Sequence, residues 1–206
     1  MVDEALVFAS ATALLELIST GQVSPVELTE LYLSRIDRLD PQLNSFLLLN
    51  RDEALQTAKV AEDAVAHGDA LGPLHGLPIP IKDTQMTKGL RTTAGSLLFK
   101  ERIPDRDAAI VERVRAAGAI ILGKTNIPEF AMVGTCENRL GEPGRNPWII
   151  FRLDILFERW YHATGMKKPA FCVFGTVAAG VYGSDDPVPD TRIPGRTGRY
   201  RRGVIN

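Results

Sequence analysis

This sequence has little of three residue types on which many enzyme and metal sites depend: cysteine, histidine and, in its second half, serine. Its two cysteines, Cys136 and Cys172, form no CxxC pair, and its three histidines are scattered along the chain. No spacing matches a known metal site, so we expect no bound metal. Two unpaired thiols are typical of a reducing compartment, and we therefore expect the protein to be cytoplasmic.

Long apolar runs and a surplus of either charge are absent as well. No window approaches the roughly 20 apolar residues that a membrane-spanning helix needs. The opening residues MVDEALVFAS carry acids but no basic run, which makes them a poor secretory signal. A net charge of -1 gives no overall attraction to nucleic acid or to anionic membranes. With 45% hydrophobic and 24% charged residues, the composition is ordinary for a soluble globular protein.

The pattern of apolar residues alternates between helix and strand as far as residue 126. It predicts helices at residues 10–20, 24–39 and 51–68, a strand at residues 43–49, an extended apolar run within residues 72–83, and a helix, glycine stop and buried strand within residues 107–126. The second helix has a clear start signal, because Ser24 is followed by Pro25 at the first helical position and by Glu27 three residues on. This alternation predicts an α/β layered fold.

Residues 72–126 contain the most specific local signals. Pro78 and Pro80 lack the N–H groups that a strand paired on both sides needs, so the extended run fits an edge or irregular strand. Asp107 is expected to cap the next helix and Gly118 to end it, with a short buried strand directly after. The inward face of this helix is expected to consist of Ile110, Val111 and Val114.

The chain changes character after Trp148. Residues 1–148 hold 15 basic and 20 acidic side chains, whereas residues 149–206 hold 9 basic and 5 acidic ones. Residues 149–165 fit an amphipathic helix, and the glycine-, proline- and arginine-rich remainder predicts coil or disorder. The basic end has the composition of a nucleic-acid-binding arm, but a solvated tail is the preferred interpretation, so nucleic acid is not an expected partner.

Lys82 is the ionisable residue whose surroundings most suggest chemistry. It follows the apolar run PIPI and precedes Asp83. A lysine at the end of a buried strand is partly desolvated, which disfavours the ammonium form and lets the neutral amine act as a general base. From composition alone the opposite interpretation is favoured, in which Lys82 reaches the surface and pairs with Asp83 or another acid.

Several motifs in series resemble the amidase signature family. They are GPLHGLPIPIKD, TTAGS, PDRDAAIVERVRAAGAIILGKTNIPEFA and GRNPW, preceded by the helical opening SPVELTELYLSRIDRLDPQLNSF. The resemblance lies within residues 5–148 and concerns only the N-terminal portion of that family's domain. It implies the N-terminal half of an α/β/α layered fold with a mixed sheet, followed by an irregular, divergent and poorly ordered segment at residues 149–206.

The resemblance implies amide hydrolysis of a small amide substrate with no metal or organic cofactor. The family's triad is a serine nucleophile, a second serine in a cis peptide and a lysine, and Lys82 matches the position of that lysine. The family's loop after the KTN strand lines the substrate pocket, which places Ala131, Met132 and Val133 beside the acyl group; core packing is the alternative for Met132. Fold-supporting roles, as hydrogen-bonding loop residues or caps, are expected for Thr92, Thr93, Ser96, Lys124 and Asn126.

The resemblance ends where the family keeps its serines. Family members carry a glycine- and serine-rich stretch soon after the NPW motif and a second one further on, and neither is present here. The only serine after Ser96 is Ser184, whose neighbours Asp185 and Asp186 would oppose a developing oxyanion. We therefore expect a truncated, inactive member of the family. A frameshift or a misread intron near residue 149 is one explanation, and a clean in-frame transcript there would exclude it.

Two other functions stay open. A non-catalytic binding or regulatory module would pair with a full-length amidase, and a nucleic-acid-binding protein would use the basic tail. Half of a layered fold would also leave the apolar strands PIPI and AIIL with open edges. We therefore expect poor solubility, and self-association through those edges, when the chain is expressed alone.

Overall fold

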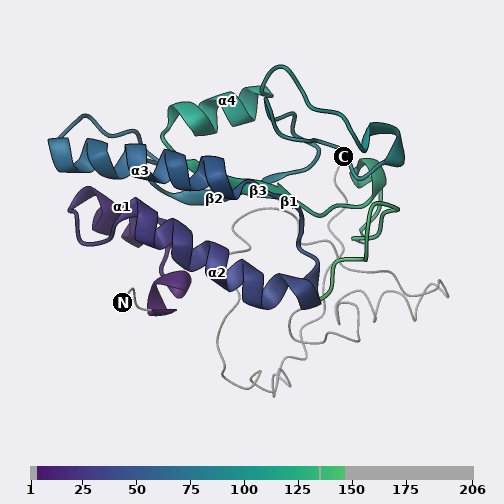
Figure 1. The fold of residues 1–206 in the computed structure, drawn as a ribbon, viewed down its shortest axis with the longest axis horizontal. Coiled ribbons are helices and arrows are strands. Elements are labelled where there is room, and N and C mark those ends of the chain that lie inside the picture. The colour runs from purple at the N-terminus through teal and green to yellow at the C-terminus, as the bar shows by residue number, and fades with distance from the viewer. Residues whose placement is uncertain (1–3, 135, 147–206) are drawn as a thin grey trace, which may run out of the picture.

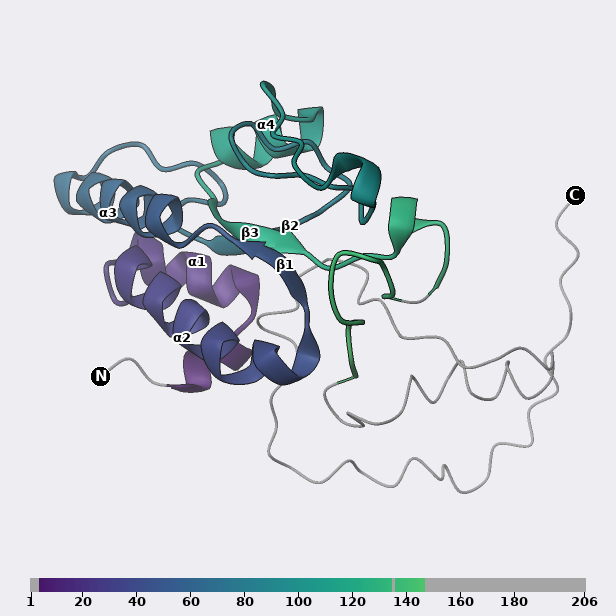
Figure 2. The ribbon, with the colours of Figure 1, turned by 45° about the vertical axis from the view of Figure 1, so that its right-hand side comes forward.

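A computed structural model describes residues 4–134 and 136–146, in which helices enclose a small sheet. The elements in chain order are η1 (Glu4–Phe8), α1 (Ala11–Ser19), α2 (Pro25–Leu43), β1 (Phe46–Leu49), α3 (Arg51–His67), β2 (Pro78–Lys82), η2 (Leu97–Phe99), α4 (Ala109–Ala116), β3 (Ile120–Thr125) and η3 (Glu129–Ala131), where η marks a 3-10 helix. Helices α1 and α2 lie on one side of the sheet and α4 on the other (Figures 1 and 2). The expected α/β/α layering is therefore confirmed. The helix and tail expected at residues 149–206 lie outside the described residues.

The sheet is mixed, with strand order β1-β3-β2. β3 is parallel to β2 and antiparallel to β1. Within the described residues β2 therefore lies at an edge of the sheet, as its two prolines predict. AIIL opens the central strand β3, where Ile120 and Ile121 pair with β2, whereas β1 pairs with β3 only at Gly123, Lys124 and Thr125. The expected self-association through open strand edges stays a prediction.

Gly123 allows the three strands to approach one another in the middle of the sheet. The register with β2 shifts beside it, between Ile79 and Pro80. Its φ is 156°, and a Cβ at this position would lie 2.1 Å from the carbonyl oxygen of Leu48 in β1. Any side chain here would collide with backbone, which explains a glycine inside an otherwise apolar strand.

One face of the sheet is covered by α1, α2 and α3. Their inward side chains are nearly free of solvent, with Leu28 at 0% and Ile18 at 1% exposed. Ser24 begins α2 as expected, since its Oγ accepts hydrogen bonds from the N–H groups of Val26 at 3.0 Å and Glu27 at 3.2 Å. The core on this face consists of Val7, Leu14, Ile18, Val23, Leu28, Tyr32, Leu33, Ile36, Ala54, Ala58, Leu77, Ile120 and Leu122.

The opposite face is covered by α4 and the long connection from β2 to α4. Val111 is fully buried there and Val114 is partly buried, but Ile110 is 51% exposed, so its expected place on the inward face is wrong. Asp107 does not cap α4 either. Its carboxylate accepts a hydrogen bond from Lys88 N and pairs with Arg115 Nε at 3.1 Å, while the N-cap position belongs to the next residue.

Two element boundaries differ from the sequence prediction. Helix α2 continues to Leu43, past Pro41, and ends at Asn44 in the left-handed conformation with φ 52°. Although Pro41 has no N–H to donate, the last turn is closed by the hydrogen bond from Asn44 N to Asp40 O at 2.8 Å. Strand β1 consequently starts three residues later than expected, at Phe46.

Candidate functional site

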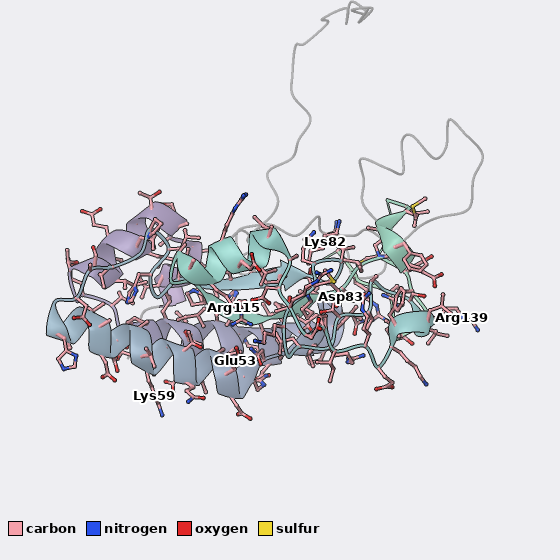
Figure 3. All side chains as sticks on the ribbon, turned by 90° about the horizontal axis from the view of Figure 1, so that it is seen from above. Glu53, Lys59, Lys82, Asp83, Arg115 and Arg139 are labelled. Atoms are coloured by element: carbon pink, nitrogen blue, oxygen red, sulfur yellow. The ribbon has the colours of Figure 1, made fainter. Side chains whose placement is uncertain are left out.

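Lys82 is the last residue of β2, at the carboxyl end of the parallel pair β2–β3. Its Cα is paired with that of Thr125, and the residue is half-buried. Figure 3 shows Lys82 and Asp83 together at this end of the sheet. The carboxyl ends of parallel strands are where α/β folds gather the loops that bind ligands, so this end is the candidate site.

Asp83 is almost completely buried, with 1% of its surface exposed. Its Oδ2 accepts hydrogen bonds from Thr93 N at 3.0 Å, from Gly95 N at 3.3 Å and from the Thr93 hydroxyl. Its backbone carbonyl accepts another from Ala94 N at 3.2 Å. A buried carboxylate is costly unless it is hydrogen-bonded. These contacts therefore fix residues 92–96, the TTAGS turn, against the end of β2 beside Lys82.

The TTAGS turn in turn contacts the loop at residues 128–133, which we call the PEFAMV loop. Ala94 O accepts a hydrogen bond from Phe130 N at 2.8 Å. Gly95 has a φ of 68°, and a Cβ there would lie 2.7 Å from the carbonyl oxygen of Pro128. Only glycine allows the two backbones to come this close.

Ser96 ties the same two segments through its side chain. It is fully buried, and its Oγ donates a hydrogen bond to Glu129 Oε1 at 2.6 Å while accepting one from Leu98 N at 3.3 Å. The sequence shows no partner for Ser96, because Glu129 lies 33 residues away and only the fold brings it near. The expected loop hydrogen-bonding role of Ser96 agrees with this geometry.

The three residues expected to line a substrate pocket are the last three of the PEFAMV loop. Ala131 is half-buried, whereas Met132 is 79% and Val133 is 56% exposed. The alternative of Met132 as a core residue is therefore wrong. Phe130 and Ala131 both have positive φ values, 52° and 54°, which are uncommon for non-glycine residues.

Lys124, rather than Lys82, is the lysine that the fold buries completely. Its exposed fraction is 0%, and its Nζ donates hydrogen bonds to Thr87 Oγ1 at 2.8 Å and to Gln85 O. Burial lowers the pKa of Lys124 to about 8, while the nearby Asp83 carboxylate opposes that shift. Lys124 lies in strand β3 instead of the expected loop, and it holds the turn after Lys82 onto the sheet.

Asn126 closes the base of the PEFAMV loop. Its Nδ2 donates to Asn44 O at 2.8 Å, and its Oδ1 accepts from Ile127 N at 2.9 Å and from Asn138 Nδ2 at 2.7 Å. These bonds connect the end of β3 to the end of α2 and to the segment after the loop. They agree with a structural role for this side chain.

Ser184, His162 and Cys172 lie outside the described residues. In the described ranges, no group of three or more His, Cys, Asp or Glu side chains is placed to hold a metal ion, and no helix there is long and apolar enough to cross a membrane. A cavity of about 380 Å³ lies at the amino end of β2, between α1 and the segment around His75, and not beside Lys82.

Comparison with known proteins shows the family to which this chain belongs. Residues 27–152 match the family model described as Amidase, so the chain belongs to the amidase family. It is 41% identical over 148 residues to a glutamyl-tRNA(Gln) amidotransferase subunit from Acidothermus cellulolyticus, a match that covers 72% of this chain and 29% of the relative. The corresponding subunit from Renibacterium salmoninarum is 45% identical over 148 residues, covering 72% of this chain and 28% of the relative.

A solved structure shows the same fold. The native peptide amidase of Stenotrophomonas maltophilia superposes with a TM-score of 0.63 at 35% identity, over 69% of this chain and 30% of that one. The resemblance to the N-terminal portion of the amidase signature family is thereby confirmed. The chain spans less than a third of the length of the relatives it matches.

Proposed function

We propose that this chain supplies the lysine and one wall of an amide-hydrolysing site, with Lys82 as its general base, and that the 206 residues alone hydrolyse no amide. One observation supports the assignment above others. Lys82 ends β2 directly before Asp83, and the buried Asp83 carboxylate fixes the TTAGS turn and, through it, the PEFAMV loop. The base and the acyl-binding wall thus belong to one hydrogen-bonded unit.

The chemistry follows from the relay that the family resemblance implies. A neutral lysine amine accepts the proton of a bridging serine hydroxyl, and that serine accepts the proton of the nucleophilic serine. The nucleophile then attacks the amide carbon, the amine leaves with a proton, and water releases the acid from the acyl-enzyme. No glycine- and serine-rich stretch follows Asn146 in this sequence, so the relay has a base here but no hydroxyl pair to act on.

The proposed substrate class is a small carboxamide. The names of the relatives, a peptide amidase and an amidotransferase, both refer to amide chemistry. On this chain the acyl group would contact Ala131, Met132 and Val133. Their apolar side chains suit an uncharged acyl group better than a charged one.

Hydrolysis of a panel of aryl and alkyl amides tests this proposal. The full chain is compared with Lys82→Ala and with buffer alone, and all three rates should be equal. A chain that is faster than Lys82→Ala would contradict the expected inactivity while supporting the role of Lys82. Two proteins that share a rate above buffer would remove Lys82 from the mechanism.

A second candidate function is a non-catalytic module that pairs with another amidase polypeptide. The exposure of Met132 and Val133 favours it, because these two side chains, which are expected to line a pocket, are exposed to solvent in the described structure. Capture of an intact amidase by the tagged chain would support this function. Failure to capture one at micromolar concentration would count against it.

A further inference from the structure

The carboxyl end of the sheet presents a group of exposed apolar side chains from two segments. Leu98 is 80% exposed and Met132 is 79% exposed. Single exposed apolar residues are common on proteins, but a cluster of them marks an interaction surface. This apolar loop surface consists of Leu97, Leu98, Phe130, Met132 and Val133.

The surface is continuous because its two segments are bound to each other. The rings of Phe99 and Phe130 meet edge to face with centroids 6.2 Å apart. The hydrogen bond from Ser96 to Glu129 connects the same two segments. Figures 1 and 2 both show η2 and η3 side by side beyond the carboxyl ends of β2 and β3.

The PEFAMV part of this surface has a strained backbone. Phe130 and Ala131 hold positive φ values of 52° and 54°, a conformation that costs a non-glycine residue roughly 1–3 kcal/mol. Such strain persists only where the surroundings fix it, and here the Phe130 N–H is bonded to the buried TTAGS turn. Lys100, Glu101 and Glu129, which are next to or within three residues of these side chains in the chain, are exposed as well, and a polar rim is typical of a protein interface.

We propose that the apolar loop surface docks a second polypeptide, the remaining portion of an amidase-family domain, which supplies the opposite wall of the acyl pocket. The proposal rests on the function proposed above for Lys82 and the PEFAMV loop. The chain matches only 28–29% of its two amidotransferase relatives, so about 70% of such a chain has no counterpart in the match. Met132 and Val133 can line a pocket only if another segment covers them.

Co-expression tests this docking. The tagged 206-residue chain is produced together with the part of the Renibacterium salmoninarum relative that follows its 148 matched residues. We expect the two polypeptides to elute together in equal amounts. A complement that stays soluble but is not captured would overturn the proposal, as would a complement that stays insoluble in the presence of this chain.

Matched variants locate the contact. Leu98→Glu and Met132→Glu place a charge in the centre of the surface and should reduce capture by on the order of tenfold or more. Val60→Glu is the control, because Val60 is 66% exposed on α3 and lies outside the surface. Equal capture by all variants, or equal loss in the control, would show that the surface is not the contact.

Two further measurements distinguish this docking from self-association of the chain and from the proposed role of Lys82. In sedimentation experiments, the chain alone should not form a dimer through this surface. A dimer that disappears in Met132→Glu would contradict the proposal, because it would show that the surface binds a second copy of this chain. Amide hydrolysis by the complex and by its Lys82→Ala variant addresses the function separately. A complex that forms but whose rate is unchanged by Lys82→Ala would refute the lysine's role and leave the docking intact.

Discussion

The two ends of this molecule differ in the exposure of their apolar side chains. Under α1, α2 and α3, apolar residues such as Leu28 and Ile18 are 0% and 1% exposed. At the carboxyl end of the sheet, Leu98 and Met132 are 80% and 79% exposed. The helical end therefore packs these side chains into a core, whereas the loop end leaves the residues of the apolar loop surface exposed.

Polar side chains show the reverse distribution. Most buried polar residues lie near the loop end, where Asp83, Ser96 and Lys124 are each 1% exposed or less. Each makes hydrogen bonds to residues at least ten positions away in the chain. The helical end is held by burial of apolar area, and the shape of the loop end is held by buried hydrogen bonds. A fold can thus preserve a site's geometry without a large local core.

Paired truncations should give the largest contrast between the two ends. Leu28→Ala removes a fully buried side chain and should lower the free energy of unfolding by about 4 kcal/mol. Leu98→Ala, which removes the same atoms from an exposed position, should change it by less than about 0.5 kcal/mol. Urea denaturation followed by circular dichroism measures both. Similar losses in the two variants would mean that the loop end is part of the core after all.

Asp83 should be the most important residue for stability at the loop end. Asp83→Ala removes the acceptor of Thr93 N and of the Thr93 hydroxyl, and one of the two acceptors of Gly95 N, and should cost about 2 kcal/mol. Asp83→Asn should cost less, because a carbonyl oxygen can still accept these bonds and the amide group can occupy the place of Oδ1, which has no partner among the described residues.

Hydrogen exchange resolves where the effect of Asp83 is felt. In Asp83→Ala the N–H of Phe130 should exchange faster, because the TTAGS turn that accepts its hydrogen bond is released. The amides of α2 should keep their protection until global unfolding. Unchanged exchange in the PEFAMV loop would show that the turn does not link it to the end of β2.

Lys124 should make stability depend on pH in a defined window. Burial lowers the pKa of Lys124 from 10.5 to about 8 in the folded state, so between these values the unfolded chain holds a proton that the folded chain has lost. Stability should therefore rise as pH increases above about 8, by at most about 1.4 kcal/mol per pH unit.

The comparison with Lys124→Met isolates this contribution. Burial raises the pKa of Tyr32, whose ionisation in the unfolded chain opposes the trend near pH 10, so unfolding is best measured from pH 7 to 9. The rise should be missing in Lys124→Met. Because the Asp83 carboxylate raises the pKa of Lys124, Asp83→Asn should move the window to lower pH. Parallel curves for the wild type and Lys124→Met would contradict the assignment.

The sequence predicts the helices and the layering because these depend on local periodicity and caps. Ser24 begins α2 where its cap signal places it, and the prolines of β2 lie in an edge strand. The errors occur where partners distant in sequence decide. Asp107 is a good cap by residue type, yet Arg115 and Lys88 N take its carboxylate.

The residues of the candidate site also differ in whether the sequence alone predicts them. Lys82 and the PEFAMV residues are found through a resemblance in short motifs, which needs no knowledge of contacts. The burial of Lys124 has no local signal, because GKTN has the composition of a loop until pairing with β1 and β2 on both sides draws it into the sheet. Glu129 has no signal either, since nothing near it in sequence refers to Ser96.

The Ser96–Glu129 hydrogen bond should contribute less to stability than the hydrogen bonds of Asp83, and its effect should be more local. Ser96→Ala removes a 2.6 Å bond whose acceptor lies on an exposed residue, and it should lower the free energy of unfolding by about 1 kcal/mol. Glu129→Gln keeps an acceptor and should cost less. In the double variant the two effects should be less than additive, because both substitutions act on the same hydrogen bond. Strict additivity would mean that the two side chains do not interact in solution. The hydrogen bond between Phe130 N and Ala94 O would then be the contact that connects the PEFAMV loop to the TTAGS turn.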